Sequence, residues 1–389
     1  MCVMIFSMGQ KLALLCLTVL AAAGAFASPP AYRLTQDWHM AGNDSIKSAW
    51  IRNVNGIGEI SYYAWYVGPE SLSGVLSQSG NMVLSGKFGA NANDAFRVAK
   101  NSKGAYAILG TNWQNNFYRS IDSPGEAVTP YGFFDEYDCR GFTDSGWMWG
   151  SSSDSHDADH EGAHAYNIYT GKHAIVQSGR AHIEGMSESG DFIMLDGSDL
   201  WPEDPARSGF FYHDRAITKL PWALTSVKFN SNGDYVGQKS HEPGLFHPVY
   251  DVVVGRGATG SVVFQNALPR GIADDMRIAI TKFDQDNVGH QSNFRSGVLT
   301  DGEFYDYHSI TQGLPAGMEI QDHWMRSTGE VAAIGKLGGD FYVLRLTSVP
   351  EPASLVALAT GALALCARRR TRQSTAATSN SLQSSSNAE

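Results

Sequence analysis

The densest run of side chains that could do chemistry is SSSDSHDADHEGAHAY at residues 151–166. It sets three histidines at every fourth position with carboxylates between them: His156, Asp157, Asp159, His160 and His164. On a helix the three imidazoles would share one face and suit zinc. On a loop the carboxylates would offer the oxygen ligands that calcium prefers. Because Ser, Asp and Gly favour a loop, a solvated acidic loop is the favoured interpretation, and a zinc or calcium site is the alternative.

Two further carboxylate clusters stand in the phrases DEYD (residues 135–138) and WPEDP (residues 201–205). Paired carboxylates beside tryptophan can hydrolyse glycosides, one protonating the leaving oxygen while the other attacks or activates water. Most acids in an acidic chain simply solvate loops, and no nucleophile elbow, phosphate-binding loop or HExxH helix accompanies these. We therefore expect no catalytic residues, with a glycan-active hydrolase or lyase on a propeller scaffold as the alternative.

Aromatic residues form a third kind of candidate surface: Tyr62, Tyr63, Trp65, Trp147 and Trp149. Their rings could stack on the faces of sugars. Packing in a core and along strand edges is the favoured interpretation, because such rings bury large apolar areas.

The overall charge is acidic, with 29 Lys and Arg against 39 Asp and Glu and a formal net charge of −10. A surface of this sign repels the phosphate backbone, so nucleic acid is excluded as a partner. Of the four cysteines, Cys139 alone lies outside the terminal segments. No disulfide is expected within the body, whose stability must come from a large apolar core.

The first residues have the three-part plan of a secretory signal peptide. Lys11 precedes an apolar run at residues 12–22, and Ala25 and Ala27 supply the small residues that a signal peptidase accepts. We expect cleavage after Ala27, so that residues 1–27 are the signal peptide and the exported body spans residues 28–348.

The C-terminal region carries three elements in order: a VPEP box, an apolar segment at residues 353–367 and a basic cluster. The box and the cluster consist of Val349, Pro350, Glu351, Pro352, Arg368, Arg369 and Arg370. Two prolines cannot continue a helix upstream, and arginines favour the cytoplasmic side of a membrane. This order therefore predicts a body held outside the cell.

Residues 349–370 resemble the PEP-CTERM sorting signal. The resemblance implies that the tail is held in the membrane and processed near the box by an exosortase, a membrane protease. Fifteen apolar residues fall short of the roughly 20 that span a bilayer, so a transient, processed anchor is favoured over a permanent transmembrane helix. Residues 371–389 form a polar tract rich in Ser and Thr, which we expect to be disordered.

Between the termini, a short phrase recurs in which polar turn residues precede a glycine and an apolar strand. Its anchors are Gly56, Gly104, Gly146, Gly190, Gly233, Asp275 and Gly329, spaced 42 to 54 residues apart. Ser, Asn or Asp followed by Gly favours a two-residue hairpin. Second turns follow in several units, at Pro124 with Gly125, Thr170 with Gly171, His213 with Asp214, and Asp301 with Gly302. Each unit is therefore expected to hold about four short strands.

Units of this length with four strands predict an all-β protein, a β-propeller of six or seven four-stranded blades, with a β-sandwich or jelly roll as the alternative. Residues 341–346 are expected to form the closing strand by pairing with the N-terminal region. The turn phrase also resembles the HAF-type extracellular repeats over residues 90–345.

Together these features predict an exported protein at the bacterial cell surface or in the extracellular matrix, transiently anchored in the membrane through its C-terminal segment. We expect a non-catalytic binding or scaffold protein whose partners are a signal peptidase, an exosortase and an extracellular polysaccharide.

Overall fold

The computed structural model of the chain describes residues 29–40, 46–66, 71–86, 97–109, 120–123, 126–128, 137–152, 162–176, 181–196, 208–241, 249–285 and 291–349. Residues Tyr32–Ser348 form one compact unit, and Met1–Ala31 with Val349–Glu389 form another. The architecture below belongs to the first of these units.

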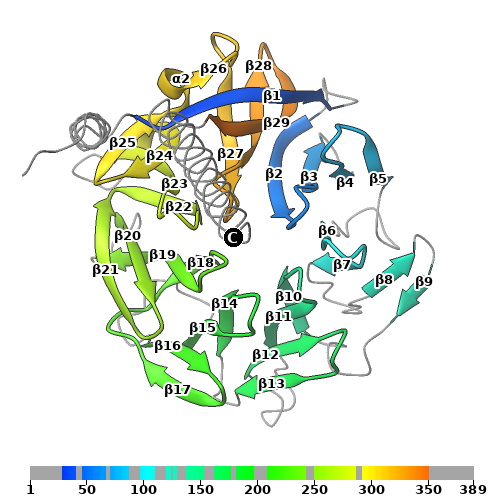
Figure 1. Cartoon of the computed structure of the whole chain (residues 1–389), viewed down its shortest axis with the longest axis vertical. Helices are drawn as coiled ribbons and strands as arrows, with labels where there is room; N and C mark the ends of the chain where they lie inside the picture. Colours follow the sequence, from blue (N-terminus) through cyan, green and yellow to red (C-terminus); the bar gives the residue numbers. More distant parts are fainter. Residues whose placement is uncertain are drawn as a thin grey trace, which may run out of the picture. The chain divides into compact units, whose positions relative to one another are not determined.

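In the described part of the chain, the strands of this unit make seven sheets that follow one another around a ring (Figure 1). The first three sheets are β2 (Ile46–Val54), β3 (Ile60–Tyr66), β4 (Ser71–Leu76) and β5 (Met82–Gly86); β6 (Arg97–Lys100), β7 (Tyr106–Leu109), β8 (Ser120–Ser123) and β9 (Glu126–Val128); and β10 (Tyr137–Phe142), β11 (Trp147–Ser152), β12 (Gly162–Asn167) and β13 (His173–Val176). The next three are β14 (His182–Met186), β15 (Phe192–Asp196), β16 (Ser208–His213) and β17 (Ala216–Lys219); β18 (Thr225–Phe229), β19 (Asp234–His241), β20 (Val249–Arg256) and β21 (Thr259–Gln265); and β22 (Ala267–Ile272), β23 (Ile278–Gln285), β24 (Gln291–Thr300) and β25 (Glu303–Asp306).

The seventh sheet closes the ring and has five strands in the order β26-β1-β29-β28-β27. Its strands are β27 (Glu319–Met325), β28 (Val331–Leu337), β29 (Asp340–Val349), β1 (Ala31–His39) and the short β26 (Thr311–Gln312), which follows the one-turn helix α2 (Tyr307–Ile310). Neighbouring strands are antiparallel in the other six sheets, and so are β27 with β28 and β28 with β29, whereas β1 and β26 pair in parallel. Strand β1 comes from the N-terminal end of the body and lies beside β29, so the predicted closing strand is confirmed. The protein is an all-β propeller with six four-stranded sheets and one five-stranded sheet, and the sandwich alternative is wrong.

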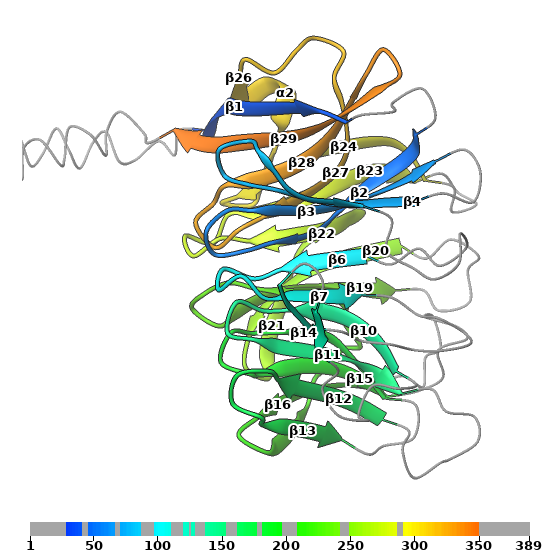
Figure 2. The same cartoon turned by 90° about the vertical axis from the view of Figure 1, so that its right-hand side faces the viewer.

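The central strands of each sheet explain the near-continuous apolar runs of the sequence. Neighbouring sheets lie face against face around the ring (Figure 2), so an interior strand is covered on both sides. Strand β15 is buried at its first four positions and β28 at its first five. A strand with one solvent-exposed face would instead alternate between buried and exposed positions. The apolar core is therefore divided among the spaces between blades, each filled by side chains from two adjacent sheets.

The recurring phrase forms the first hairpin of every sheet. In one copy the Asn101 amide bonds the Ala105 carbonyl over 3.0 Å, and the Gly104 amide bonds the Asn101 carbonyl over 3.2 Å. The same two bonds recur in all seven sheets. They define a three-residue loop in which a turn is followed by a residue in the left-handed region, so the two-residue loop expected from the sequence is wrong here.

Two of the predicted anchors are displaced. In the first sheet the left-handed residue is Gly58 (φ +83°) rather than Gly56, and in the sixth it is Met276 (φ +67°) rather than Asp275. The other five anchor glycines have φ between +79° and +95°, as the turn requires.

The second turns include the predicted two-residue loops. Asp301 and Gly302 join β24 to β25 with φ of +51° and +81°. Between β16 and β17 the turn residues are Asp214 and Arg215, one position later than expected. Gly171 lies in the predicted turn after β12, and residues 124–125 lie outside the described part.

Candidate functional site

The strands nearest the axis of the ring are β2, β6, β10, β14, β18, β22 and β27, one from each sheet (Figure 1). In the described part of the chain, six of these strands contain a β-bulge, and in four of them the extra residue is charged. The charged bulged residues are Arg52 in β2, Arg140 in β10, Glu184 in β14 and Arg270 in β22. A bulge bends its strand and redirects the side chain of the extra residue. The fold therefore uses one local device, repeated in four blades, to place charge near the axis.

Glycine follows the bulged residue in three of the four strands, and at two positions the neighbouring blade explains why. A Cβ at Gly185 would overlap the carbonyl oxygen of Val227 in the next sheet, and one at Gly271 would overlap that of Met325. Gly271 also has a φ of +146°, which L side chains rarely adopt. The absence of a side chain lets successive inner strands approach closely around the axis.

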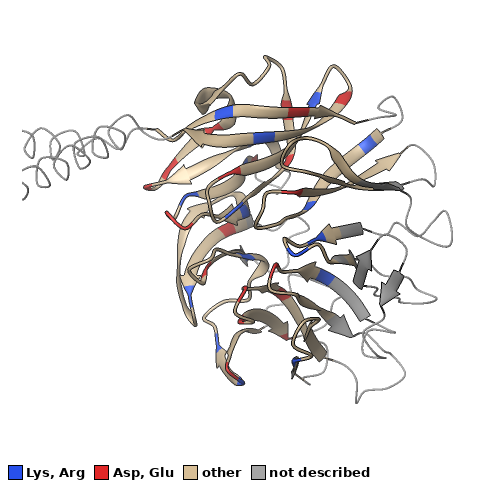
Figure 3. Cartoon of the chain, turned by 45° about the vertical axis from the view of Figure 1, so that its right-hand side comes forward, with Lys and Arg blue, Asp and Glu red and all other residues tan. Residues whose placement is uncertain are grey.

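A cavity of about 390 Å³ lies among the inner strands β2, β10, β14, β18 and β27 and the hairpin turns that follow them. Four cations line it: Arg52, Arg140, Lys228 and Arg326. Two acids line it as well, Asp144 and Glu188, with the rings of Phe142, Trp149, Phe229 and Trp324. Lys and Arg are otherwise interspersed with Asp and Glu over the sheets (Figure 3). We call this space the axial channel.

The two acids of the axial channel accept hydrogen bonds from backbone amides of neighbouring hairpin turns. Asp144 accepts from the Ser102 amide over 2.6 Å and from the Gly56 amide, which joins its turn to those of the two preceding sheets. Glu188 accepts from the amides of Asp144 over 3.1 Å and Ser145 over 2.7 Å. These carboxylates tie adjacent blades together, and their charge is offset by the amide dipoles they accept from.

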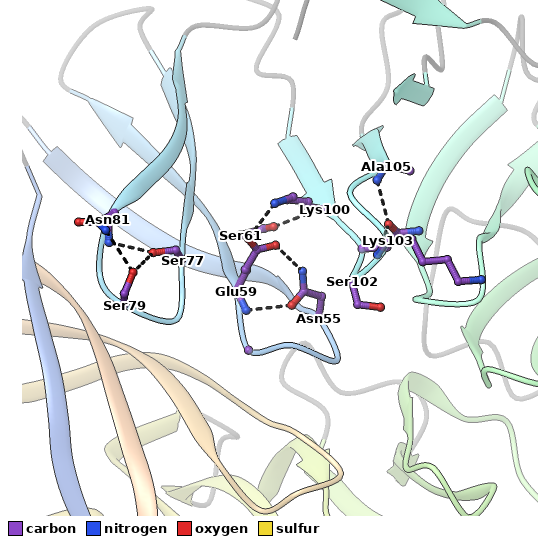
Figure 4. Close-up of polar contacts among 12 residues, drawn as sticks. Asn55, Glu59, Ser61, Ser77, Ser79, Asn81, Lys100, Ser102, Lys103 and Ala105 are labelled. Carbon is purple, nitrogen blue, oxygen red and sulfur yellow. Dashed lines mark hydrogen bonds and ion pairs between the residues drawn. The ribbon is translucent and has the colours of Figure 1, made fainter. Parts of the chain in front are cut away.

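The first two blades are joined by a similar set of polar contacts, shown in Figure 4. The Lys100 ammonium lies 2.7 Å from a carboxylate oxygen of Glu59, and the Lys100 amide donates to the Ser61 hydroxyl over 3.2 Å. Glu59 is itself held by Asn55, whose side chain donates to its carboxylate over 2.8 Å. Polar groups at the turns therefore serve first to hold the ring together.

The cations of the axial channel have different surroundings. The Nζ of Lys228 lies 4.0 Å from the centroid of the Trp324 ring, and the Arg52 guanidinium lies over Trp50 and Tyr63 at 5.5 and 5.6 Å. Burial, and next the nearby charge of Arg270, lower the pKa of Lys228 to about 8, although Asp322 and Glu184 act in the opposite direction. Lys228 thus carries a proton at neutral pH that it can lose under mildly alkaline conditions.

Two buried carboxylates beside the axial channel are engaged in ion pairs. Glu184 lies 2.7 Å from His182 and 3.5 Å from Arg140, and it accepts from the Ser226 amide over 2.9 Å. Burial alone would raise the pKa of Glu184, but these partners lower it overall, with the His182 hydrogen bond contributing most.

Asp322 is the second of these carboxylates. It accepts from the Ile51 amide of the adjoining blade over 2.8 Å and lies 3.4 Å from Arg270. Burial raises the pKa of Asp322 against the lowering effect of Arg270 and the amides. The carboxylate therefore connects the last blade to both of its neighbours.

Of the candidate metal ligands, the structure describes His164 alone. His164 is 4% exposed on the interior strand β12, opposite Gly150 and Ile175, so the helical arrangement of the three histidines is wrong at this end. His156, Asp157, Asp159 and His160 lie outside the described residues, and a calcium or zinc site there stays a prediction. Among the side chains that the structure describes, no group of three or more His, Cys, Asp and Glu is placed to hold a metal ion.

The aromatic residues divide between core and surface. Tyr62 and Tyr63 are buried in the core, as the favoured interpretation predicted, and Trp147 packs against the core of the third and fourth blades. Trp65 is 45% exposed and lies under the Lys47 ammonium at 5.2 Å. Trp149 lines the axial channel, packed over Gly141.

The other expected site residues fall outside the described part: Ala25, Ala27, Pro350, Glu351, Pro352, Arg368, Arg369 and Arg370. Val349 is the last residue of β29. Among the residues that the structure describes, no helix is long and apolar enough to cross a membrane, and the apolar segment at residues 353–367 is not among them.

The cations of the axial channel were missed in the sequence, although a weak signal exists for two of them, Arg52 and Arg140. Arg52, Arg140, Glu184 and Arg270 each stand three residues before the first position of a hairpin turn, and the last three precede glycine. A charged residue followed by glycine, three positions before a hairpin turn, is therefore the sequence pattern that indicates the bulge.

Comparisons with known proteins identify the C-terminal signal. Residues 348–370 match the PEP-CTERM protein-sorting motif, which implies export, association with the cell surface and recognition by an exosortase, a membrane protein. The resemblance to HAF-type repeats is not supported. No curated protein matches the chain.

Several solved structures are similar to this chain at low identity. The β-propeller domain of the Trilobed protease from Pyrococcus furiosus is similar over 79% of this chain and 85% of that one, with 7% identity and a TM-score of 0.41. A putative TolB from Agrobacterium tumefaciens is similar over 83% and 100%, with 12% identity and a TM-score of 0.38. The strand order within the seven sheets itself shows the propeller fold.

Proposed function

We propose that this protein is a non-catalytic binding protein of the cell surface or extracellular matrix, which presents its propeller to an extracellular polysaccharide. The observation that carries the proposal is the position of the sorting motif. Its matched range begins at Ser348, within the last strand of the ring. The whole propeller therefore precedes the signal and would be delivered outward as one folded body.

Processing near the VPEP box is compatible with an intact ring. Leu346 is the last buried residue of β29, while Thr347 is exposed and Ser348 and Val349 are half-buried. Ser348 still contributes a contact, since the Arg277 guanidinium donates to its hydroxyl over 3.2 Å. A cut beyond Val349 would leave both the core and this hydrogen bond in place.

Binding is favoured over catalysis by the state of the carboxylates at the axis. Hydrolysis of a glycoside needs two carboxyl groups that can reach the scissile bond, one as acid and the other as base or nucleophile. Asp144 and Glu188 instead accept backbone amides, and Glu184 and Asp322 are paired with cations. These acids support the ring, which suits a scaffold that binds a ligand without transforming it.

The proposal is tested by expressing the full-length chain in a host that carries an exosortase and measuring the intact mass of protein released from its surface. We expect a mature N-terminus at Ser28 and no peptide beyond about Pro352. A variant with Pro350→Ala and Pro352→Ala is expected to keep the tail. Recovery of the wild-type protein in the cytosol with its leader attached would overturn export, and turnover of a bound polysaccharide by the purified body would favour the hydrolase or lyase.

A further inference from the structure

We infer that the axial channel is a binding site for an anionic group, such as the carboxylate of an acidic sugar, held by Arg52, Arg140 and Lys228. The inference rests on the proposed function and names the ligand class for its site. It starts from the distribution of charge, because a chain with a net charge of −10 gathers four cations from four different blades in one cavity.

Part of this charge is already offset, because Arg140 lies 3.5 Å from Glu184 and Arg326 forms an ion pair with Glu330. Asp144 and Glu188 each accept two backbone amides of neighbouring turns. The oxygens of these carboxylates are therefore engaged by the turns that form one end of the cavity. Among the lining residues that lie on the inner strands β2, β10 and β18, the charged ones are the cations Arg52, Arg140 and Lys228.

Lys228 is the clearest candidate to meet a ligand. Its contact is the face of Trp324, and among the described residues no carboxylate lies within ion-pair distance of its Nζ. The nearest acids, Glu184 and Asp322, are engaged by His182 and Arg140 and by Arg270 and the Ile51 amide. A half-buried ammonium without a carboxylate partner gains most from an incoming anion, because the surrounding protein screens the attraction less than water does.

The size and walls of the cavity suit a small acidic saccharide. A volume of about 390 Å³ lies within the range of small-molecule sites. Trp149 lines the same space and is only partly buried, so its ring can offer an apolar face to the C–H face of a sugar. Cations beside an aromatic side chain can recognise a sugar whose ring is uncharged apart from one anionic group.

The test uses isothermal titration calorimetry of the purified body with digalacturonate, with its uncharged methyl ester as the matched ligand. We expect the acid to bind and the ester to bind at least 10-fold more weakly. Lys228→Met should weaken binding of the acid at least 10-fold, whereas Lys219→Met, on the exposed edge strand β17, should change it less than two-fold. Equal binding of acid and ester, or equal affinity in Lys228→Met and wild type, would overturn the inference.

A second readout does not depend on the folding of a variant. The acid should raise the melting temperature of the wild-type body, because a ligand that binds only the folded state stabilises it, and the ester should not. Inorganic phosphate is run in parallel: displacement of the uronate by phosphate supports the same anion site and points to a phosphorylated ligand as its natural source.

The outcome also separates this inference from the proposed function. A body that binds a neutral polysaccharide but no anion keeps the proposed function and loses the anion site. A body that binds the acid in the axial channel but is never exported keeps the anion site and loses the proposed function.

Discussion

Arg345 of the last strand donates from its guanidinium to the carbonyl oxygen of Gly58 in the first blade over 2.6 Å. The same buried side chain pairs with Glu330 in the turn of its own sheet and donates to Gln36 of β1 over 3.0 Å. One residue thus joins β29, the N-terminal strand and the adjoining blade. Closure of the ring is a matter of specific polar contacts as well as of strand pairing.

Replacing Arg345 with Met should lower the free energy of unfolding by about 3 kcal/mol, because it leaves the Gly58 carbonyl unsatisfied and removes one of the two guanidinium partners of Glu330, the other being Arg326. Urea denaturation followed by tryptophan fluorescence measures the change. Arg295→Met is the control, since its pair with Asp284 is long, at 3.8 Å, and exposed, and it should cost under about 0.5 kcal/mol. Equal losses in the two variants would show that Arg345 does not support closure.

Gly271→Ala should destabilise the ring by about 2 to 3 kcal/mol, because the new Cβ meets the backbone of Met325 in the next blade and cannot be relieved by a side-chain rotation. Gly237→Ala on β19 provides the comparison, since a Cβ there would lie 3.3 Å from the side chains of Leu224 and Val227. We expect it to cost less than half as much in the same denaturation experiment. A larger loss of stability in Gly237→Ala than in Gly271→Ala would mean that adjacent blades can move apart at the axis to accept a Cβ.

Asn230→Ala should lower the free energy of unfolding by about 1 to 3 kcal/mol, because the hydrogen bonds of the Asn230 side chain are lost. The buried amide accepts from the Asn232 and Asp234 amides over 3.0 and 2.9 Å and donates to the Ala273 carbonyl of the next blade over 3.1 Å. Asn232→Ala, at the exposed tip of the same turn, should change stability by under about 0.5 kcal/mol. Hydrogen exchange should also rise at the 230–234 turn in Asn230→Ala, and unchanged exchange there would contradict the role.

Binding of an anion in the axial channel should weaken as pH rises through about 8. Burial, then Arg270 and Arg52, lower the pKa of Lys228 to about 8, while Asp322 and Glu184 raise it. Above that pH the ammonium loses its proton, and with it the attraction for the ligand. Calorimetric titrations between pH 6.5 and 9.5 should show the decline in wild type and a flatter profile in Lys228→Met.

The contribution of Lys228 to folding has the opposite sign. Between the folded pKa of about 8 and the ordinary value of 10.5, the unfolded chain holds a proton that the folded chain has released. The contribution of Lys228 to stability therefore rises with pH across this window and is lost as pH falls through about 8. A wild-type stability profile indistinguishable from that of Lys228→Met between pH 7.5 and 10.5 would contradict the assignment.

Much of the architecture could be predicted from the chain because its hairpins are local. Gly104, Gly146 and Gly233 mark the left-handed position of the turns, and their regular spacing gave the blade length and the fold class. The prediction failed where the local code was ambiguous. The first turn contains two glycines, Gly56 and Gly58, and the sequence does not show which of them takes the left-handed position. Met276 has a left-handed conformation that is unusual for its residue type.

The candidate site, unlike the hairpins, could not be predicted from local sequence patterns. The sequence by itself determined the repeated hairpins, the proline-containing sorting signal and an acidic body, each through neighbours within a few residues. Only the tertiary structure decided that Arg52, Arg140 and Lys228 share one cavity. A strand's alternating pattern does not reveal where a bulge inserts its extra residue. These three cations also come from three different blades and are separated by dozens of positions in the sequence. The axial charge therefore exists only when the ring has closed and the inner strands have met.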